Sequence, residues 1–467
     1  MVGRNGGGVP SGLRFVNADN GLTLISKLGE KYIMLHDPSH QAPPPTEEPI
    51  FLRTAEKDVL RRLIGELATV AADPVNQERA ALWQKLNNLS SERPLVWINE
   101  IPWHEMNVDD ELTLRTEHPW ARSLENELRR TLYQWRHMPG DMVVENWLEC
   151  PLALYSTDFG IIENVDVVKT DEASDVVSRH FNIQIQDDSD LEKIRMPRVE
   201  HNAKVTEIWY EAMSELAAGI MPVRKTGQTH IWFTPWDYLI RWWGIQEAMI
   251  DMIERPDFVH AAVDRMVDAW MVELDQFEER NLLSLDCRNV RVGSGGYGYV
   301  SELPGQDYDP DHVRPRNMWG CSNAQIFSEV SPEMHWEFAL KHDLRWLERW
   351  GLTYYGCCEP LDRKIELMRR IPNLRKLSVS PWCNAEKLIE QVGGDYVISR
   401  KPSPAIFAND DWHPHEARKQ LREFLRVADR KCHIELIMKD ISTVRYEPQR
   451  LWEWADIAME EAVNFAR

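Results

Sequence analysis

The chain has 467 residues, of which 43% are hydrophobic and 28% are charged, and its formal net charge is −21. This balance is typical of a globular protein, and no apolar run approaches the roughly 20 residues that a membrane span needs. The acidic excess argues against nucleic-acid binding, because phosphate contacts need clustered Lys and Arg. The seven cysteines stand at scattered spacings and residues 1–12 lack the apolar core of a signal peptide, so we expect a reducing, cytoplasmic location.

The N-terminal fifth of the chain is predicted to be an extension that precedes the main fold. Apolar residues at helical spacing predict two amphipathic helices within residues 52–88. Buried strands begin only after this point, so we assign residues 1–93 to a tail and helical extension. The alternating pattern of residues 160–190 predicts an antiparallel excursion. From about Trp236 to Glu279 the pattern is helical, with an interruption near Pro256.

Strands and helices alternate through the second half of the chain, which implies a parallel sheet with right-handed crossovers. Eight segments have the pattern of parallel strands: residues 93–99, 142–150, 229–236, 318–327, 352–358, 374–380, 395–402 and 433–440. Eight strands close a barrel, so the predicted fold is α/β, a (β/α)8 TIM barrel over residues 94–467. Its insertions are expected at about 160–220 and 282–316. A doubly wound open sheet is the alternative, because the first strands are less regular than the last five.

The second insertion contains the glycine-rich run VGSGGYG, residues 292–298. A phosphate-binding loop ends in Lys followed by Ser or Thr and opens a helix, and this run does neither. The run therefore does not predict a nucleotide site.

Polar residues follow the later predicted strands, at the carboxyl ends where barrels carry their reactive groups. These residues are Cys357, Cys358 and Glu359 after the fifth strand, Trp382 and Cys383 after the sixth, Lys401 after the seventh, and Lys439 and Asp440 after the eighth. Cys432 precedes its strand and is expected at the opposite rim.

The thiols form a candidate metal site. A catalytic zinc ion takes three protein ligands and keeps an open position. Cys357, Cys358 and Cys383 are the candidate ligands, although adjacent cysteines are expected to point in different directions. The other interpretation is that these thiols are small buried hydrophobes, as free cysteines commonly are.

Acid–base and substrate-binding roles are assigned to neighbouring side chains. The candidate catalytic residues are Glu359, Lys439 and Asp440. For Glu359 the alternative is a carboxylate that accepts backbone N–H bonds at the start of the next helix. The chain has 20 Trp residues, most of which are expected to wedge helices against the sheet. Aromatic and basic residues near strand ends line ligand pockets, and the candidates here are Trp103, Tyr355, Trp382 and Lys401.

With these segments in view, the chain resembles the uroporphyrinogen decarboxylase-like superfamily. The run FTPWDYLIRWWGIQEAMIDMIERPDFVHAAVDRM (residues 233–266) resembles the family's third strand and the following helices. QIFSEVSPEMHWEFAL (residues 325–340) resembles the segment after the fourth strand, and the last 150 residues keep the family's strand order. The resemblance covers roughly residues 94–467 and implies the barrel.

Two departures from that family bear on activity. The arginine-rich loop with which porphyrinogen decarboxylases hold several carboxylates is replaced here by INEIPWHEM (residues 98–106), so that substrate is not expected. Zinc-dependent corrinoid methyltransferases have a His-x-Cys pair after the fifth strand and a Cys after the eighth. In this chain Tyr355 stands at the His position, Cys357 at the Cys position, and Lys439 with Asp440 where the second Cys would be.

The resemblance implies a zinc-dependent methyltransferase that moves a methyl group from a small methylated substrate to a corrinoid protein, and the many Trp residues suggest that this substrate is aromatic. The expected partners are the substrate, the corrinoid protein and a second copy of the chain. Two alternatives stay open. A metal-free decarboxylase or lyase would hold a small carboxylate with Lys401, Lys439, Arg400 and Arg445. A noncatalytic binding barrel would bind the ligand without turnover.

Overall fold

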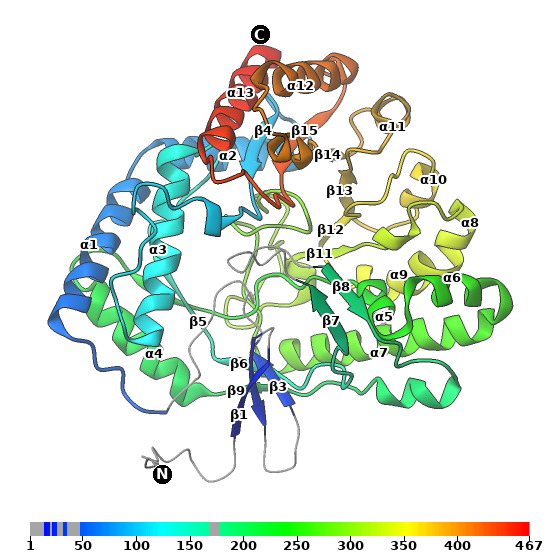
Figure 1. The fold of residues 1–467 in the computed structure, drawn as a ribbon, viewed down its shortest axis with the longest axis horizontal. Helices are drawn as coiled ribbons and strands as arrows, with labels where there is room; N and C mark the ends of the chain where they lie inside the picture. The colour runs from blue at the N-terminus through cyan, green and yellow to red at the C-terminus, as the bar shows by residue number, and fades with distance from the viewer. Residues whose placement is uncertain (1–13, 19–20, 26–30, 35–46, 169–177, 467) are drawn as a thin grey trace.

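The structure, a computed structural model, describes residues 14–18, 21–25, 31–34, 47–168 and 178–466. Within this part the fold is mixed α/β, with a parallel sheet of six strands (Figure 1). Its strands, in spatial order, are β11 (Trp319–Ser322), β12 (Leu352–Tyr355), β13 (Leu374–Val379), β14 (Val397–Arg400), β15 (His433–Met438) and β4 (Leu95–Ile98). Every neighbouring pair runs parallel.

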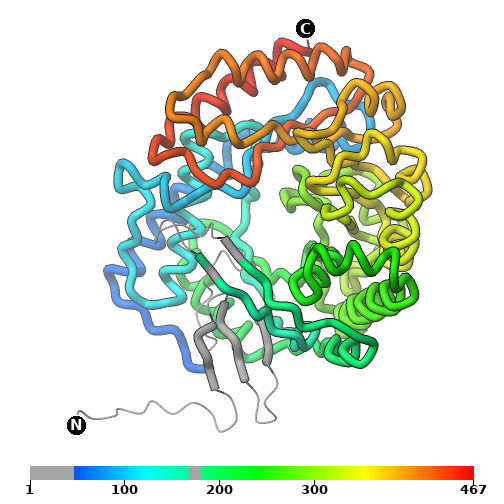
Figure 2. Tube along the Cα trace, turned by 45° about the vertical axis from the view of Figure 1, so that its right-hand side comes forward, coloured from blue at the N-terminus to red at the C-terminus, as the bar shows by residue number. Residues whose placement is uncertain are grey.

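The sheet joins the two ends of the main fold. β15 pairs with β4, with Glu435 opposite Leu95 and Met438 opposite Ile98. Figure 2 shows the result: the C-terminal segments, orange and red, come back beside the blue segment that contains β4. Five of the six strands alternate with helical segments along the chain, which confirms the predicted strand–helix alternation of the second half.

Two further parallel strands form a separate pair, β5 (Leu148–Pro151) and β10 (Val223–Thr226). Seven of the eight predicted strand segments thus contain a strand, but residues 229–236 do not. There the apolar side chains of Ile231 and Phe233 pack into the core without joining a ladder, and the strand lies earlier, at β10. In the described residues the six-stranded sheet and the pair are not hydrogen-bonded into one closed sheet.

Antiparallel strands lie outside the main sheet. A five-stranded sheet has the order β1 (Arg14–Ala18), β2 (Gly21–Ile25), β3 (Lys31–Met34), β6 (Leu154–Ser156) and β9 (Val199–His201). The predicted antiparallel excursion is confirmed by a second unit, the pair β7 (Val165–Val168) and β8 (Ser178–Phe181). The strands β1 to β3 were not predicted from the sequence.

Helices lie around the six-stranded parallel sheet (Figure 1). They are α1 (Thr54–Ala71), α2 (Val75–Asn87), α3 (Pro119–His137), α4 (Ala203–Ala217), α5 (Pro235–Trp243), α6 (Ile245–Glu254), α7 (Pro256–Glu279), α8 (Pro332–His335), α9 (Lys341–Leu347), α10 (Ile365–Met368), α11 (Ala385–Val392), α12 (Pro414–Ala428) and α13 (Gln449–Ala466). α1 and α2 confirm the predicted amphipathic pair. Among the described residues, no helix is both long and apolar enough to cross a membrane.

The glycine-rich run packs against one face of the six-stranded sheet. The N–H of Gly296 donates to Glu435 Oε1 at 3.0 Å, and Ser294 Oγ lies 2.9 Å from the hydroxyl of Tyr354. A Cβ atom at Gly296 would stand 2.3 Å from the ring of Trp83, so only glycine fits there. The insertion is therefore part of the core that supports the sheet.

Most of the large aromatic residues are packing residues. The fully buried set includes Trp83, Trp236, Trp242, Trp243, Trp319, Trp346, Trp350 and Trp454. Phe233 stacks on Trp346 with ring centroids 4.6 Å apart. These contacts agree with the interpretation that tryptophans wedge helices against the sheet.

Candidate functional site

The carboxyl ends of β12, β15 and β4 meet at one edge of the sheet. Lys439, directly after β15, places its Nζ 3.7 Å from Cys357 Sγ, in the loop after β12. The same Nζ lies 3.5 Å from Glu100 Oε2, in the loop after β4. Parallel strands bring their carboxyl ends to the same edge, and for this reason residues more than 300 positions apart in the sequence come into contact.

The two adjacent thiols form a pair. Cys357 Sγ and Cys358 Sγ are 3.7 Å apart, so the expectation that they point in different directions is wrong. Side chains alternate only within a strand, and β12 ends at Tyr355. Gly356 follows with a φ of +97°, a conformation that glycine tolerates, and the turn it begins directs both thiols to one side.

Their mutual hydrogen bond, burial and nearby charge shift the pKa values of the two thiols in opposite directions. The hydrogen bond that Cys357 shares with Cys358, together with its burial, raises the pKa of the Cys357 thiol. The same hydrogen bond and the ammonium of Lys439 lower the pKa of the Cys358 thiol against the opposing effect of burial. Cys358 is also the more exposed of the two. Because the thiolate is the nucleophilic form of cysteine, we expect Cys358 to be the more reactive member of the pair.

Two carboxylates accompany Lys439. Asp440 Oδ2 accepts a hydrogen bond from Lys439 Nζ at 2.8 Å, and the backbone N–H of Asp440 donates to Glu100 Oε2 at 3.1 Å. Arg291 Nη1 lies 2.8 Å from Glu100 Oε1. Burial alone would raise the pKa of Glu100, but Arg291 and Lys439 lower it to about 2. Burial and the neighbouring Glu100 raise the pKa of Asp440, whereas Lys439 opposes this rise, so Asp440 takes up a proton more readily than Glu100.

The backbone at these carboxylates is unusual. Glu100 has a φ of +50° and Asp440 a φ of +55°. Residues other than glycine rarely adopt such positive backbone angles. Such conformations persist where the surrounding structure fixes them, and they cluster at functional sites. Two of them, at residues joined by a hydrogen bond, support a functional role for this edge of the sheet.

Lys401 lies next to this group, directly after β14. Its Nζ donates to the hydroxyl of Tyr354 and to Ser399 Oγ at 2.8 Å. Burial lowers the pKa of Lys401 to about 7, and the positive charges of Lys439 and Arg291 add to the effect. Burial thus makes Lys401 easier to deprotonate than an exposed lysine.

Glu359 is enclosed by backbone. Its side chain is fully buried, its Oε1 accepts the N–H of Ala324 at 3.0 Å, and its Oε2 accepts the N–H of Cys357 at 2.8 Å. Burial raises its pKa in spite of these hydrogen bonds. Glu359 thus accepts backbone N–H bonds, as the alternative interpretation expects, but from Ala324 and Cys357 and not from the start of the next helix, α10; its catalytic role stays a prediction.

The three predicted thiol ligands are not gathered. Within residues 47–168 and 178–466, no group of three or more His, Cys, Asp and Glu side chains is arranged to hold a metal. Cys383 is buried beside Asp362, and burial raises its pKa to about 12, which favours the neutral thiol. A three-ligand zinc site therefore does not fit the described residues.

The three aromatic candidates for substrate binding differ in their surroundings. Tyr355 is fully buried and its hydroxyl lies 2.6 Å from His335 Nε2. Trp103 packs edge-on against Tyr133 with ring centroids 6.0 Å apart. Trp382 is 73% exposed, so it is a surface residue. Lys401 is the candidate substrate-binding residue whose electrostatic neighbours include Lys439 and Cys357; the roles of the other three stay predictions.

Arg291, Ser294 and Tyr354 complete the site and were not predicted from the sequence. Arg291 and Ser294 belong to the insertion, which carried no recognisable motif. Tyr354 stands two positions before Gly356 on β12, and the strand period of two would have placed it opposite Tyr355. Glu100, in the loop after β4, connects Lys439 with Arg291 through its two carboxylate oxygens.

Comparisons with known proteins identify no family for this chain. No family model matches it and no curated protein matches it. Solved structures do match, among them a methyltransferase from Methanosarcina mazei with a TM-score of 0.47 and 11% sequence identity. The match covers 82% of this chain and 98% of the other. A likeness this remote leaves the reaction to be argued from the site itself.

Proposed function

We propose that the protein is a methyltransferase that takes a methyl group from a small methylated compound onto the thiol pair Cys357–Cys358. One observation carries the proposal: Lys439 Nζ lies 3.7 Å from Cys357 Sγ, which lies 3.7 Å from Cys358 Sγ. An ammonium group at this distance favours a thiolate in the pair, and a thiolate is a strong nucleophile for carbon.

In the proposed step the thiolate of Cys358 attacks the methyl carbon of the substrate. An S–CH3 bond forms, and the bond between CH3 and the substrate's oxygen or nitrogen breaks, with its electron pair going to that atom. Asp440 donates the proton that the leaving atom needs, because burial and Glu100 raise its pKa. The products are a neutral thioether, the demethylated substrate and an Asp440 carboxylate, which the adjacent Lys439 stabilises.

In the proposed reaction a second acceptor then takes the methyl group from the thioether. The family resemblance implies a corrinoid protein, and a thioether at Cys358, the more exposed thiol, is placed where a partner could approach. Zinc, the other expected group, would require ligands beyond those gathered here.

The test uses reduced, full-length protein and a panel of methoxylated benzoates and methylated amines that carry an isotope-labelled methyl group. We expect label on the peptide that contains Cys358 and release of the demethylated compound. Cys358→Ser should abolish labelling, and Asp440→Asn should slow it about 100-fold, as for loss of an acid–base group. Cys432→Ser, at the other end of β15, is the matched control. Absence of label with every donor would refute the proposal.

A second candidate function has its own supporting observation. Lys401, Lys439 and Arg291 place three basic groups near one another, and basic groups of this kind hold a carboxylate and stabilise developing negative charge. A metal-free lyase or decarboxylase would use them. Of the other cations expected for this role, Arg400 donates to Ser380 O and Arg445 pairs with Asp410.

Carbon dioxide release from small carboxylates, unaffected by Cys358→Ser and abolished by Lys401→Met, would favour the lyase. Tight binding of the same carboxylates with neither CO2 release nor methyl labelling would favour a noncatalytic binding protein.

A further inference from the structure

The thiol pair has a geometry that suits a second kind of chemistry, independent of methyl transfer. Sulfur atoms bonded at roughly 2.3 Å to one tetrahedral or pyramidal atom lie about 3.5 to 3.8 Å apart. Cys357 Sγ and Cys358 Sγ are 3.7 Å apart without any such atom. The loop therefore holds the two sulfurs at the distance that they would have if both were bonded to one common atom.

A disulfide fits the same residues less well. Its sulfurs must approach to about 2.05 Å, and its Cα atoms usually lie about 4.4 to 6.8 Å apart. Adjacent residues joined by a trans peptide have their Cα atoms about 3.8 Å apart. Closing the S–S bond would strain the loop, which is fixed by the N–H of Cys357 on Glu359 and by Ser378 Oγ on the carbonyl of Cys357 at 2.6 Å.

The number of sulfur donors in the loop limits the kind of ligand that it can bind. Two thiols converge, and in the described part of the chain no third metal-binding side chain joins them. A trivalent arsenic atom that carries one organic substituent has two remaining positions, both of which exchange readily with thiols. Cys358 is partly exposed, while Cys357 is 6% exposed, so the ligand would meet Cys358 first and close on Cys357.

We propose that Cys357 and Cys358 form a binding site for monosubstituted trivalent arsenicals. With phenylarsine oxide as the probe, two As–S bonds form and the arsenic–oxygen bond breaks. The oxygen leaves as one molecule of water with the two thiol protons. Neither sulfur nor arsenic changes oxidation state, so the step needs no other reactant.

The experiment measures adducts on the reduced, full-length protein by intact-mass spectrometry and peptide mapping. We expect one phenylarsenic group per chain, with the mass of one water lost, on the peptide that contains residues 357–358. Two alkylatable thiols should disappear together. Dimercaptopropanol should release the adduct, whereas a monothiol at the same thiol concentration should not. The reason is that two linked As–S bonds hold the arsenic more tightly than separate monothiols can compete for it.

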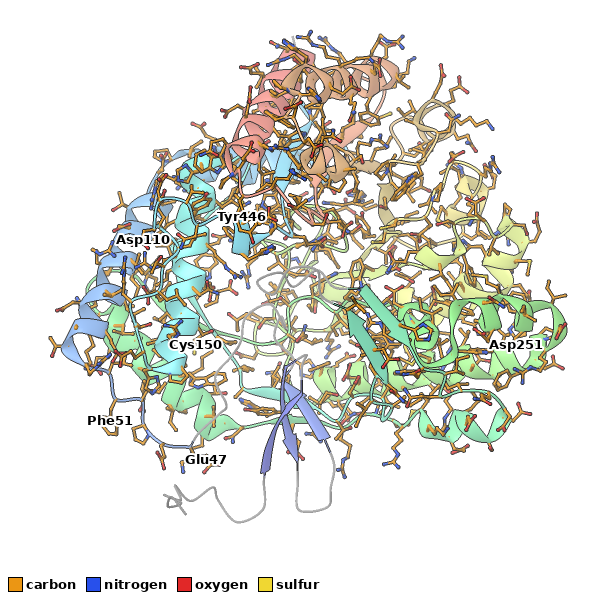
Figure 3. All side chains as sticks on the ribbon, in the orientation of Figure 1. Glu47, Phe51, Asp110, Cys150, Asp251 and Tyr446 are labelled. Atoms are coloured by element: carbon orange, nitrogen blue, oxygen red, sulfur yellow. The ribbon has the colours of Figure 1, made fainter. Side chains whose placement is uncertain are left out.

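Single-thiol variants give the decisive comparison. Cys358→Ser should weaken binding by about 100-fold or more, the effect of losing one of two linked contacts, and Cys357→Ser should do the same. Cys150→Ser and Cys383→Ser are the controls; Cys150, labelled in Figure 3, lies on β5 in a different core cluster. The proposal is overturned if wild-type protein takes no adduct, if the adduct maps to another cysteine, or if Cys358→Ser binds normally. Adduct formation without methyl labelling would leave it standing and refute only the proposed function.

Discussion

Lys376 on β13 and Glu435 on β15 form an ion pair at 3.0 Å with both side chains fully buried. Lys376 Nζ also donates to the carbonyl of Tyr297, and Glu435 accepts the N–H of Gly296. The pair therefore anchors the glycine-rich run to the sheet that carries the site.

Removing one partner should leave an uncompensated buried charge. We expect Lys376→Met to lower the free energy of unfolding by about 3 to 5 kcal/mol, measured by urea denaturation. The double variant Lys376→Met/Glu435→Gln should recover part of this loss, because no charge is then unpaired and the amide oxygen still accepts from Gly296. A double variant as unstable as the sum of the single ones would contradict this account.

Lys439 should control the reactivity of Cys358. Because its positive charge lowers the pKa of that thiol, Lys439→Met should move the midpoint of the pH profile for iodoacetamide alkylation upward by about one pH unit. The rate at Cys358 is followed by peptide mapping. Lys341→Met, which removes an exposed lysine paired with Glu337, is the control. An unchanged profile in Lys439→Met would show that the ammonium does not act on the thiol.

The variant Glu359→Gln distinguishes a structural role of Glu359, which would hold the thiol loop in place, from a catalytic role. An amide presents one oxygen where the carboxylate presents two, so one of the N–H groups of Ala324 and Cys357 loses its acceptor. We expect a loss of about 1 to 3 kcal/mol in the free energy of unfolding, with alkylation of Cys358 retained. Glu366→Gln, at an exposed position nearby, serves as the control. Normal thermal stability combined with loss of methyl labelling would instead support a catalytic Glu359.

Stability should depend on pH through Glu273 on α7. Burial raises its pKa to about 7, although Ser156 Oγ donates to its Oε1 at 2.6 Å. The folded protein then binds a proton that the unfolded chain releases near pH 4.3, so stability falls as pH rises from about 4 to 7. Glu273→Gln should be more stable than the natural protein above pH 7, by on the order of 3 kcal/mol.

The same two proteins should converge in stability toward pH 4, where the carboxyl group is protonated in both states. Urea denaturation at several pH values provides the measurement, with Glu279→Gln, an exposed change on the same helix, as control. A difference that stays constant with pH would show that the charge of Glu273 is not its source.

The placement of Lys439 and Cys357 could be predicted from the sequence because it follows from two local patterns, the strand–helix alternation and the position of polar residues at strand ends. The segment 229–236 was wrongly predicted as a strand, because burial of Ile231 and Phe233 in a helical core gives the same apolar pattern as a strand. β10, the strand actually present, is largely exposed at Arg224 and Lys225 and lacks the apolar signal.

Contacts between distant segments could not be read from local patterns. Arg291 and Ser294 reach the site only because the insertion packs on the sheet. The direction of the Cys357 and Cys358 thiols depends on the turn at Gly356, beyond the end of the strand, where the two-residue period no longer applies. The surroundings of Cys383 could not be read from the sequence either, because they depend on the loop after β13, which places this thiol beside Asp362.

The packing of the glycine-rich run has a consequence for any attempt to shorten this protein. A segment that sequence comparison would treat as a dispensable insertion fills the interior face of the sheet and supplies Arg291 to the carboxylates at its edge. Excising residues 282–316 would leave Lys376, Lys401 and Glu435 facing an unfilled space and would free Glu100 from its guanidinium partner. A minimal version of the protein must therefore keep this segment.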